Sequence, residues 1–477
     1  MFLEKKVDTD TRMIVLELNE LTPSLMRRFM SEGKLPHFSR LYHEAEIYTT
    51  TAEEQPPHLD PWIQWVTVHT GLNFRDHGLE RLNEGHKLEV PRVWDLLSNA
   101  GRRAWVCGSM NVGDARPAGS CVMPDPWTTI VRPHPRSLEP YFTFVQRQVM
   151  EHTSDRAPSD PRALLRFLWF MASHGLSRDT VAAIARQLAE ERSGTGRWKR
   201  AALLDKVQFD VFAWYYRKIR PHFATFFVNS TAHYQHLHWR EMDPDAFTAQ
   251  PSEAQRREYR DAIEYGYREM DELVARVLAM ADSRTTIVMA TALSQQPCLM
   301  FEEHGGKFFY RPVDFGRLTS FAGVRDRYTV SPVMAHQFHL YFDAEEAAER
   351  AAERLTRVRY QDRQALAVGR NGSGIFVGCR IYEPLPRDAR LTLAPGADDV
   401  SFFELFYQVD GVKSGMHHPD GMLWIRTPAR RHAVYAKHVP LAAVAPTILE
   451  HFRVPRPPYM SPPVNEWTDA PVLGATA

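Results

Sequence analysis

Short apolar runs alternate with amphipathic stretches along this chain. Five runs have the length and composition of buried strands: MIVLEL (13–18), AWVC (104–107), ATFFV (224–228), TIVMA (286–290) and MLWI (422–425). Between the third and fourth runs, seven apolar residues recur on one helical face: Ala262, Ile263, Met270, Leu273, Val274, Val277 and Leu278. The pattern predicts an α/β fold with a mostly parallel central sheet sandwiched between helices.

Two stretches interrupt this pattern. Residues 133–218 are rich in arginine and aromatic residues and have no strand of their own, which predicts a helical cap insertion. Residues 295–393 contain strand-like runs around an amphipathic helix, which predicts a second, smaller α+β insertion; the runs are HQFHLYFD (336–343), QALAVG (364–369) and GIFVGCRIYE (374–383). The predicted core comprises residues 10–132, 219–294 and 394–465. Insertions in such folds usually lie over the carboxyl ends of the strands, where ligands bind.

Composition limits the possible partners and the environment. The 477 residues carry 58 basic and 58 acidic side chains, so no net charge attracts a nucleic-acid polymer. The four cysteines are scattered and predict neither a disulfide framework nor a thiolate metal site. The first residues, MFLEKKVDTDTR, contain no apolar run, and no segment approaches the roughly 20 apolar residues that span a bilayer. We therefore expect a soluble, cytoplasmic protein with a small-molecule substrate. The sequence leaves open whether the chain forms a homo-oligomer.

Five motifs in order resemble those of a known family. They are MIVLELNELTP (13–23), EGKLPHFSRL (32–41), WVTVHTGLNFRDHGL (65–79), GMHHPDGMLWI (415–425) and VAPTILEHFRVPRP (444–457). Together they resemble the type I phosphodiesterase/nucleotide pyrophosphatase branch of the alkaline phosphatase superfamily, over most of the chain. The resemblance implies an alkaline phosphatase-like fold. It also implies catalysis by two metal ions, usually zinc, and a threonine or serine nucleophile.

The first metal site implied by the resemblance departs from the family pattern. Its aspartate corresponds to Asn19, and the nucleophile falls on Pro61, or on Asp60 if one residue has slipped. The later Asp-His pair falls on Ala292 and Leu293, and neither side chain can bind a metal. We therefore expect that the first metal site is lost and that two-zinc hydrolysis by a threonine does not operate.

The second implied metal site is partly retained. Its aspartate corresponds to Ala232, but His236 and His417 match the two family histidines. With His233 nearby, these histidines predict a nitrogen-rich site for at most one divalent ion, zinc by preference. Alternatively, His233 and His238 are surface or hydrogen-bonding residues at the mouth of a pocket.

Further polar residues are predicted at the loop ends around this cleft. Glu20 follows the first strand, and Asp60 is either a carboxylate nucleophile or base, or the N-cap of the helix that follows it. The candidate catalytic residues are His236, His417, Asp60, His233 and Glu20. The candidate substrate-binding residues are Asn19, Gln64, Trp62, Gln235, His238 and His304. Core packing is the alternative for Trp62, and a flexible surface loop is the alternative for His304.

Two functions fit these observations. The chain is either a divergent enzyme acting on a phosphorylated, nucleotide- or sugar-linked small molecule through a histidine-rich cleft, or a non-catalytic pseudo-phosphodiesterase that binds a ligand or a partner enzyme there. The replaced positions lie among clustered polar residues, which favours the enzyme. Both hypotheses predict that Asn19, Asp60, His236 and His417 converge at one end of the sheet.

Overall fold

The computed structural model describes residues 11–114, 116, 119–151, 160–331, 337–394, 399–409, 411–468 and 471. The N-terminal residues 1–10, for which no apolar segment was predicted, lie outside this described part. His336, the first residue of one predicted strand, also lies outside it.

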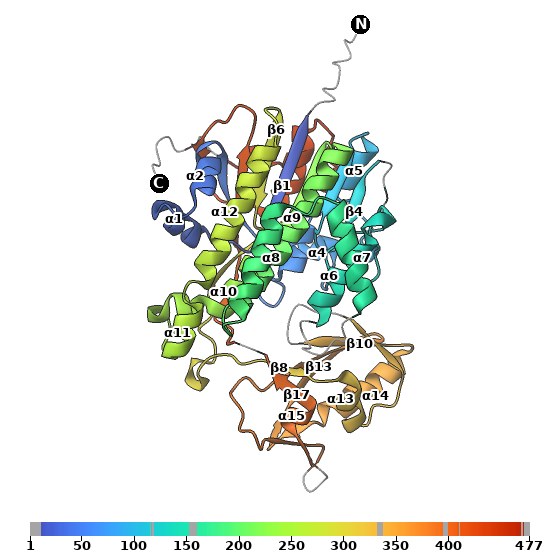
Figure 1. Cartoon of the computed structure of the whole chain (residues 1–477). Coiled ribbons are helices and arrows are strands. Elements are labelled where there is room, and N and C mark those ends of the chain that lie inside the picture. The colour runs from blue at the N-terminus through green and yellow to red at the C-terminus, as the bar shows by residue number, and fades with distance from the viewer. Residues whose placement is uncertain are drawn as a thin grey trace.

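A nine-stranded sheet forms the centre of the molecule (Figure 1). Its strands are β1 (Arg12–Leu18), β2 (Glu46–Thr51), β3 (Ala104–Cys107), β4 (Cys121–Met123), β5 (Phe223–Val228), β6 (Thr285–Ala290), β19 (Asp420–Arg426), β20 (Ala433–Val434) and β21 (Val439–Pro440). The order is β20-β2-β19-β6-β1-β5-β3-β4, and β21 pairs with β2. All pairs are parallel except those of β19, which runs antiparallel to β2 and β6. The predicted α/β class and all five predicted strands are confirmed.

Helices cover both faces of this sheet. One face packs against α1 (Pro23–Ser31), α2 (Pro36–His43), α9 (Arg200–Ile219), α10 (Ser230–Met242) and α12 (Ala262–Met280). The other packs against α3 (Pro61–Thr70), α5 (Val93–Asn99) and α16 (Val444–His451). The alternation of β1 produces this arrangement, because Ile14 and Leu16 enter the first core whereas Met13 and Val15 enter the second.

The stretch predicted as a helical cap consists of helices. They are α6 (Glu139–Glu151), α7 (Pro161–Ser173), α8 (Arg178–Glu191) and α9. Helix α9 packs directly on the sheet, since the rings of Phe209 and Phe212 lie 5.3 and 5.0 Å from that of Phe226 in β5. The last helix of this stretch therefore covers the main sheet, and the boundaries of a separate cap stay a prediction.

The second insertion, predicted over residues 295–393, belongs to a region with a core of its own, which is drawn from residues 310–406 and so extends past the predicted boundary. Its strands are β8 (Tyr310–Pro312), β9 (Tyr328–Ser331), β10 (Phe338–Phe342), β11 (Arg359–Tyr360), β12 (Arg363–Gln364), β13 (Leu366–Asn371), β14 (Gly374–Cys379), β15 (Arg390–Thr392), β16 (Asp399–Ser401) and β17 (Phe406–Gln408). Its helices are α13 (Phe315–Phe321), α14 (Glu345–Thr356) and α15 (Phe402–Leu405). Figure 1 shows these elements as a lobe below the main sheet.

A two-stranded ribbon connects this lobe to the sheet. The chain leaves through β7 (Ser294–Pro297) and returns through β18 (Gly415–His418), which pair antiparallel. In this register His417 lies opposite Gln295. Two short helices, α4 (Phe74–His77) and α11 (Glu253–Tyr259), complete the α-helices of the described residues.

Candidate active site and metal centre

Four predicted site residues from distant parts of the chain lie together. Glu20 follows β1, Asp60 precedes α3, His236 is on α10 and His417 is on β18. The Oε2 atom of Glu20 lies 3.2 Å from Nε2 of His236 and 3.5 Å from Nε2 of His417. On the other side of its ring, Nδ1 of His417 lies 3.5 Å from Oδ1 of Asp60. The carboxyl end of β1 therefore gathers two carboxylates and two imidazoles.

The backbone holds Glu20 in an unusual conformation. Its φ of 60° is in the left-handed region, which costs a residue other than glycine on the order of 1–3 kcal/mol. The Glu20 N–H donates to the carbonyl of Thr291 at 3.3 Å, and the Glu20 carbonyl accepts from Nε2 of Gln235 at 2.7 Å. Gln235 is itself fixed by the hydroxyl of Tyr267, at 2.8 Å. These contacts from three elements keep the carboxylate directed at the two histidines.

The Glu20 carboxylate is buried and ionised. Oε1 accepts a hydrogen bond from Nδ2 of Asn19 at 2.8 Å, and Oε2 accepts one from Nε2 of Gln295 at 2.6 Å. Burial raises its pKa, but the charges of His417 and His236 and the hydrogen bonds of His236 and Gln295 outweigh burial, so the pKa falls to about 2. The group therefore presents a fixed negative charge at neutral pH.

The two histidines direct their Nε2 atoms toward this carboxylate. On the other side of its ring, Nδ1 of His236 lies 3.0 Å from the carbonyl oxygen of Gly415 and donates a hydrogen bond to it. Burial lowers the pKa of His417 to about 4, although Glu20 opposes the shift. Gly415 permits this approach, because a Cβ atom there would lie 2.3 Å from the carbonyl oxygen of Gln235.

The donor set suits a divalent cation. One ligand atom each from Glu20, His236 and His417 can be chosen so that all lie within 4.8 Å of one another. Two imidazole nitrogens and one carboxylate oxygen are a combination that zinc accepts. Hydrogen bonds from Asn19 and Gln295 to Glu20, and from His236 to Gly415, are the supporting contacts that metal ligands usually have. We call these three residues the Glu20 half of the site.

The neighbouring side of the site has no such donors. Nδ2 of Asn19 donates to Glu20 and, at 2.7 Å, to Oδ1 of Asn229, while its Oδ1 accepts from the indole of Trp65 at 2.8 Å. Ala292 and Leu293, which follow β6, are fully buried. We call Asn19, Ala292 and Leu293 the Asn19 half. A second metal ion, as the sequence resemblance implies, does not fit here, because no carboxylate or imidazole belongs to this half.

Comparisons with known proteins found similar structures but no matching sequence family or curated protein. No family model matches the chain, and no curated protein matches it by sequence. The alkaline phosphatase PafA superposes with a TM-score of 0.47 at 11% identity, covering 96% of this chain and 98% of the other. Phosphonoacetate hydrolase from Sinorhizobium meliloti 1021, in complex with phosphonoformate, gives 0.45 at 10% identity, with coverages of 93% and 95%. Murine ectonucleotide pyrophosphatase/phosphodiesterase 5, inactive and in complex with AMP, gives 0.41 at 9% identity, with coverages of 96% and 100%.

Among the described residues, none of the helices combines the length and hydropathy that a membrane span requires.

Asp60 stands immediately before the first residue of α3. It occupies the predicted N-cap position, but its side chain accepts no hydrogen bond from the helix. The carboxylate is instead 29% exposed and close to His417. Burial raises the pKa of Asp60 to about 7, while Lys413 opposes the shift and Glu20 adds to it.

Three predicted substrate-binding residues, Gln235, Gln64 and Trp62, make internal contacts. Gln235 is fully buried and supports Glu20, as described above. Gln64 is also buried, and its Nε2 donates to the carbonyl of His58 at 3.1 Å. The indole of Trp62 donates to the carbonyl of Glu80 at 2.9 Å, and its ring packs against the second core. Their predicted contacts with substrate stay predictions.

The remaining predicted histidines lie outside the Glu20 half. His238 is buried and stacks on Tyr259, with ring centroids 4.4 Å apart, and burial lowers its pKa to about 3. His233 lies one turn before His236 on α10 with an exposed side chain, and it is absent from the group of ligand atoms. His304 is exposed beside Glu303 in the second insertion. The ligand group thus consists of Glu20, His236 and His417, whereas the predicted group consisted of His233, His236 and His417.

Two residues near the site had no role in the sequence prediction. Gln295 was assigned to the edge of the second insertion, yet it donates to Glu20 and, at 3.0 Å, to the carbonyl of Ala232. Lys413 precedes β18 and is half-buried. The only sequence signal for either residue is its position beside the motif that contains His417.

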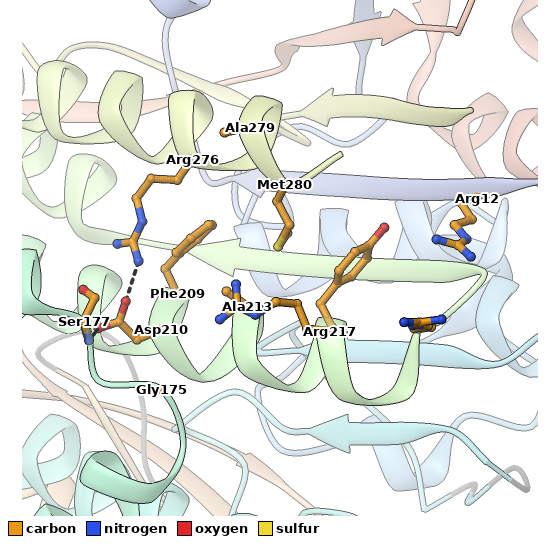
Figure 2. Close-up of a pocket in the computed structure, with 12 residues that line it drawn as sticks. Arg12, Gly175, Ser177, Phe209, Asp210, Ala213, Arg217, Arg276, Ala279 and Met280 are labelled. Carbon is orange, nitrogen blue, oxygen red and sulfur yellow. Dashed lines mark hydrogen bonds and ion pairs between the residues drawn. The ribbon is translucent and has the colours of Figure 1, made fainter. Parts of the chain in front are cut away.

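A separate groove lies at the opposite end of β1 (Figure 2). It has a volume of about 750 Å³, and Arg12, Phe209, Arg217 and Arg276 line it. Arg276 is paired with Asp210 there, as Figure 2 shows. Arg12 begins β1 whereas Glu20 follows its end, so at about 3.3 Å per residue the Arg12 end of the groove lies on the order of 25 Å from the ligand group.

Proposed function

We propose that this chain is a divergent enzyme that acts on a phosphorylated, nucleotide- or sugar-linked small molecule through the Glu20 half of the site. The convergence of one ionised carboxylate and two imidazole nitrogens at the carboxyl end of β1 supports this proposal. The imidazoles are accessible, since the side chains of His236 and His417 are 25% and 16% exposed. A buried structural cluster would not need that access.

We further infer that Glu20, His236 and His417 hold one divalent ion, zinc by preference. When bound, the ion supplies positive charge that polarises a phosphoryl oxygen. Asn19 and Gln295 orient the Glu20 carboxylate, and the carbonyl of Gly415 orients His236. Such supporting contacts typically matter by 10–100-fold in metal affinity or activity.

Asp60 is the residue best placed to accept a proton from the attacking group. Pro61 has no nucleophilic atom, so the family nucleophile is absent at that position. The Asp60 carboxylate is free of the helix end, partly exposed and 3.5 Å from His417. We infer that it takes the proton of an attacking water or alcohol, while His417 holds the carboxylate in position.

Metal analysis followed by activity assays tests this function. We expect the purified protein to hold about one zinc ion per chain. Activity, screened on phosphate mono- and diesters, should fall about 10²–10⁴-fold in His236→Ala and in Asp60→Asn. His233→Ala is the matched control, because that histidine is on the same helix but exposed and outside the ligand group.

Absence of bound metal, together with absence of turnover on every ester, would contradict the enzyme proposal. The alternative is then a non-catalytic protein that binds a ligand or a partner enzyme through the same cleft. In that case His236→Ala should weaken binding of that ligand and leave no activity to lose.

A further inference from the structure

The groove at the amino end of β1 has the size of a small-molecule site (Figure 2). Its volume of about 750 Å³ lies within the roughly 300–1,000 Å³ of typical ligand pockets. One wall is a single face of α9, because Phe209, Ala213 and Arg217 are each four residues apart and Arg220 follows three residues later. The end of α12 and the start of β1 complete the groove.

The charges at one end of the groove are paired within the protein. Arg276 forms an ion pair with the buried Asp210, and its guanidinium carbon lies 4.2 Å from the ring centroid of Phe209. The other carboxylate oxygen of Asp210 accepts from the N–H of Ser177 at 2.9 Å. Arg276 and Asp210 are therefore occupied with each other and with their neighbours.

The other end of the groove contains arginines of a different kind. Arg12 has a partner, because its guanidinium lies 3.4 Å from the carboxylate of Asp282. Arg217 and Arg220 are exposed and line the groove. Within the described part of the chain, neither of these two guanidinium groups has a hydrogen bond, an ion pair or an aromatic ring beside it. Both remain available to a ligand.

The groove as a whole carries an excess of positive charge. Four arginines line it, and two carboxylates pair with two of them. The carboxyl ends of α9 and α12 add about half a negative charge each, so these groups together offset about three of the four positive charges. About one positive charge is left, which an anion from outside the chain would compensate.

The backbone of Arg220 indicates that its side chain is retained at a cost. Arg220 ends α9 with a φ of 44°, in the left-handed region where glycine is the favoured residue. Its N–H donates to the carbonyl of Tyr216 at 3.0 Å, and its carbonyl accepts from Nη2 of Arg103 at 3.1 Å. Glycine could make both of these backbone contacts without strain. What arginine adds at this position is the guanidinium.

The arrangement suits a small organic anion. A guanidinium group can donate two parallel hydrogen bonds to the oxygens of a phosphate, phosphonate or carboxylate. The wall of the groove also has apolar side chains, among them Ala213 and Met280, and Figure 2 shows Met280 between Arg276 and Arg12. A mostly apolar wall with a few polar groups is typical of ligand sites.

We propose that Arg217 and Arg220 bind the oxyanion group of a small organic molecule whose apolar part lies against Ala213 and Met280. The Arg12 end of this groove is on the order of 25 Å from the Glu20 half. The groove is therefore a second binding site, and it does not depend on the proposed function.

Calorimetric binding of phenylphosphonate tests the assignment, because this probe carries an oxyanion and an apolar ring but no ester bond. We expect Arg217→Gln and Arg220→Gln each to weaken its affinity roughly tenfold, the lower range for a hydrogen bond between charged groups, since both side chains are exposed. Arg166→Gln is the matched control: Arg166 is an exposed arginine of α7 outside the groove, and the affinity should not change.

Two further probes identify the class of anion. Inorganic phosphate lacks the ring and should bind roughly tenfold more weakly than phenylphosphonate, because no apolar surface is buried. Benzoate carries the same ring on a carboxylate, so the tighter of the two aromatic probes shows which oxyanion the arginines prefer. Failure of both aromatic probes to bind would overturn the proposal.

The variant Arg220→Gly separates a binding role from a structural role. Glycine relieves the left-handed backbone and removes the guanidinium. We therefore expect the melting temperature to stay equal or rise, while the affinity for phenylphosphonate falls roughly tenfold. A lower melting temperature with unchanged affinity would show that Arg220 only ends the helix, and would overturn its assignment.

A last measurement uses the wild-type protein and does not depend on the folding of a variant. Phenylglyoxal, an arginine reagent, should modify Arg217 and Arg220, as mass spectrometry can show, and phenylphosphonate should protect both but not Arg166. Absence of protection would overturn the proposal. Binding that is lost in His236→Ala would place the probe in the Glu20 half and would also overturn it, whereas binding that persists there supports a separate site.

Discussion

The Glu20 half and the Asn19 half of the site lie next to each other, yet they hold opposite kinds of side chains. In the Glu20 half, one carboxylate oxygen and two imidazole nitrogens lie within 4.8 Å of one another, and the carboxylate is ionised. In the Asn19 half, every polar group of Asn19 is bonded within the protein. One half has the chemistry of a ligand site, whereas the other belongs to the packed interior.

The two halves are nevertheless connected through Asn19. Its amide donates to Oε1 of Glu20, so a residue that replaces the metal-binding aspartate of the resemblance now orients the remaining carboxylate. An aspartate could not donate this hydrogen bond. The change at position 19 therefore suits a site with one cation better than a site with two.

The comparison is tested most strongly by removing the Glu20 charge. We expect Glu20→Gln to lower zinc affinity by roughly two to three orders of magnitude, because a neutral amide replaces the only carboxylate of the ligand group. Competition titration with a zinc chelator measures the effect. Zinc affinity equal to that of the wild type would show that the Glu20 half is not a metal site.

Glu17 provides the matched control on the same strand. It is buried in the core, where Oε1 lies 2.9 Å from Nε2 of His69 and Oε2 accepts from Ser109 at 2.7 Å. We expect Glu17→Gln to leave zinc affinity unchanged and to lower the free energy of unfolding by about 1–3 kcal/mol, because it disturbs buried hydrogen bonds. The two variants separate loss of the ligand from loss of stability.

The Asn19 half is tested by restoring the missing aspartate. In Asn19→Asp the new carboxylate would face the oxygens of Glu20 and Asn229 in a buried site, where Asn19 now donates to both. We expect the free energy of unfolding to fall by about 3–5 kcal/mol, the usual cost of an uncompensated buried charge. Urea titration with and without added zinc measures it. If a second bound zinc ion restored the free energy of unfolding, the view that the Asn19 half holds no metal would be contradicted.

The sequence predicted most of the central sheet because its strands are continuous apolar runs. It did not predict β2, whose sequence EIYTTT is largely polar, or the very short β4, β20 and β21. The sequence also did not predict that β19 runs antiparallel to its neighbours β2 and β6. An apolar run indicates burial but carries no sign of strand direction, which depends on where the preceding insertion returns to the sheet.

Site residues at motif positions or loop ends could be predicted from the sequence. Residues whose role depends on how distant elements pack together could not. His236 and His417 came from motif positions, and Glu20 and Asp60 from their places at loop ends. His233 was grouped with them from its spacing alone, but its exposure depends on what packs around α10. The role of Gln295 follows from the pairing of β7 with β18, and no local sequence pattern encodes that register.

A third prediction concerns His77, the last residue of the short helix α4. His77 is buried, its Nδ1 accepts from the N–H of Leu79 at 3.1 Å, and burial lowers its pKa from 6.5 to about 4 despite Asp76. Between pH 6.5 and about 4 the unfolded chain binds more protons at this residue than the folded chain. Stability should therefore fall as the pH falls through this window, by on the order of 3 kcal/mol in total.

Urea unfolding of the wild type and of His77→Gln across this window measures that contribution. Glutamine does not titrate, so the slope of the unfolding free energy against pH should be smaller in the variant. Other buried histidines, such as His339, contribute equally to both proteins. Identical slopes would show that His77 does not contribute to the loss of stability in acid.

The smallest expected effect separates the two possible roles of Asp60. Asp60 and Asp314 both occupy N-cap positions, but only the side chain of Asp314 accepts a hydrogen bond from its helix, from the N–H of Arg317 at 2.8 Å. We expect Asp314→Ala to cost about 0.5–2 kcal/mol of unfolding free energy and Asp60→Ala to stay within about 0.5 kcal/mol. Thermal and urea unfolding measure both.

A loss in Asp60→Ala as large as that in Asp314→Ala would make Asp60 a structural cap, and would remove the residue to which we assign proton transfer. A small loss in stability together with a large loss in activity would instead place Asp60 with the Glu20 half, because its carboxylate would then serve the substrate and not the helix.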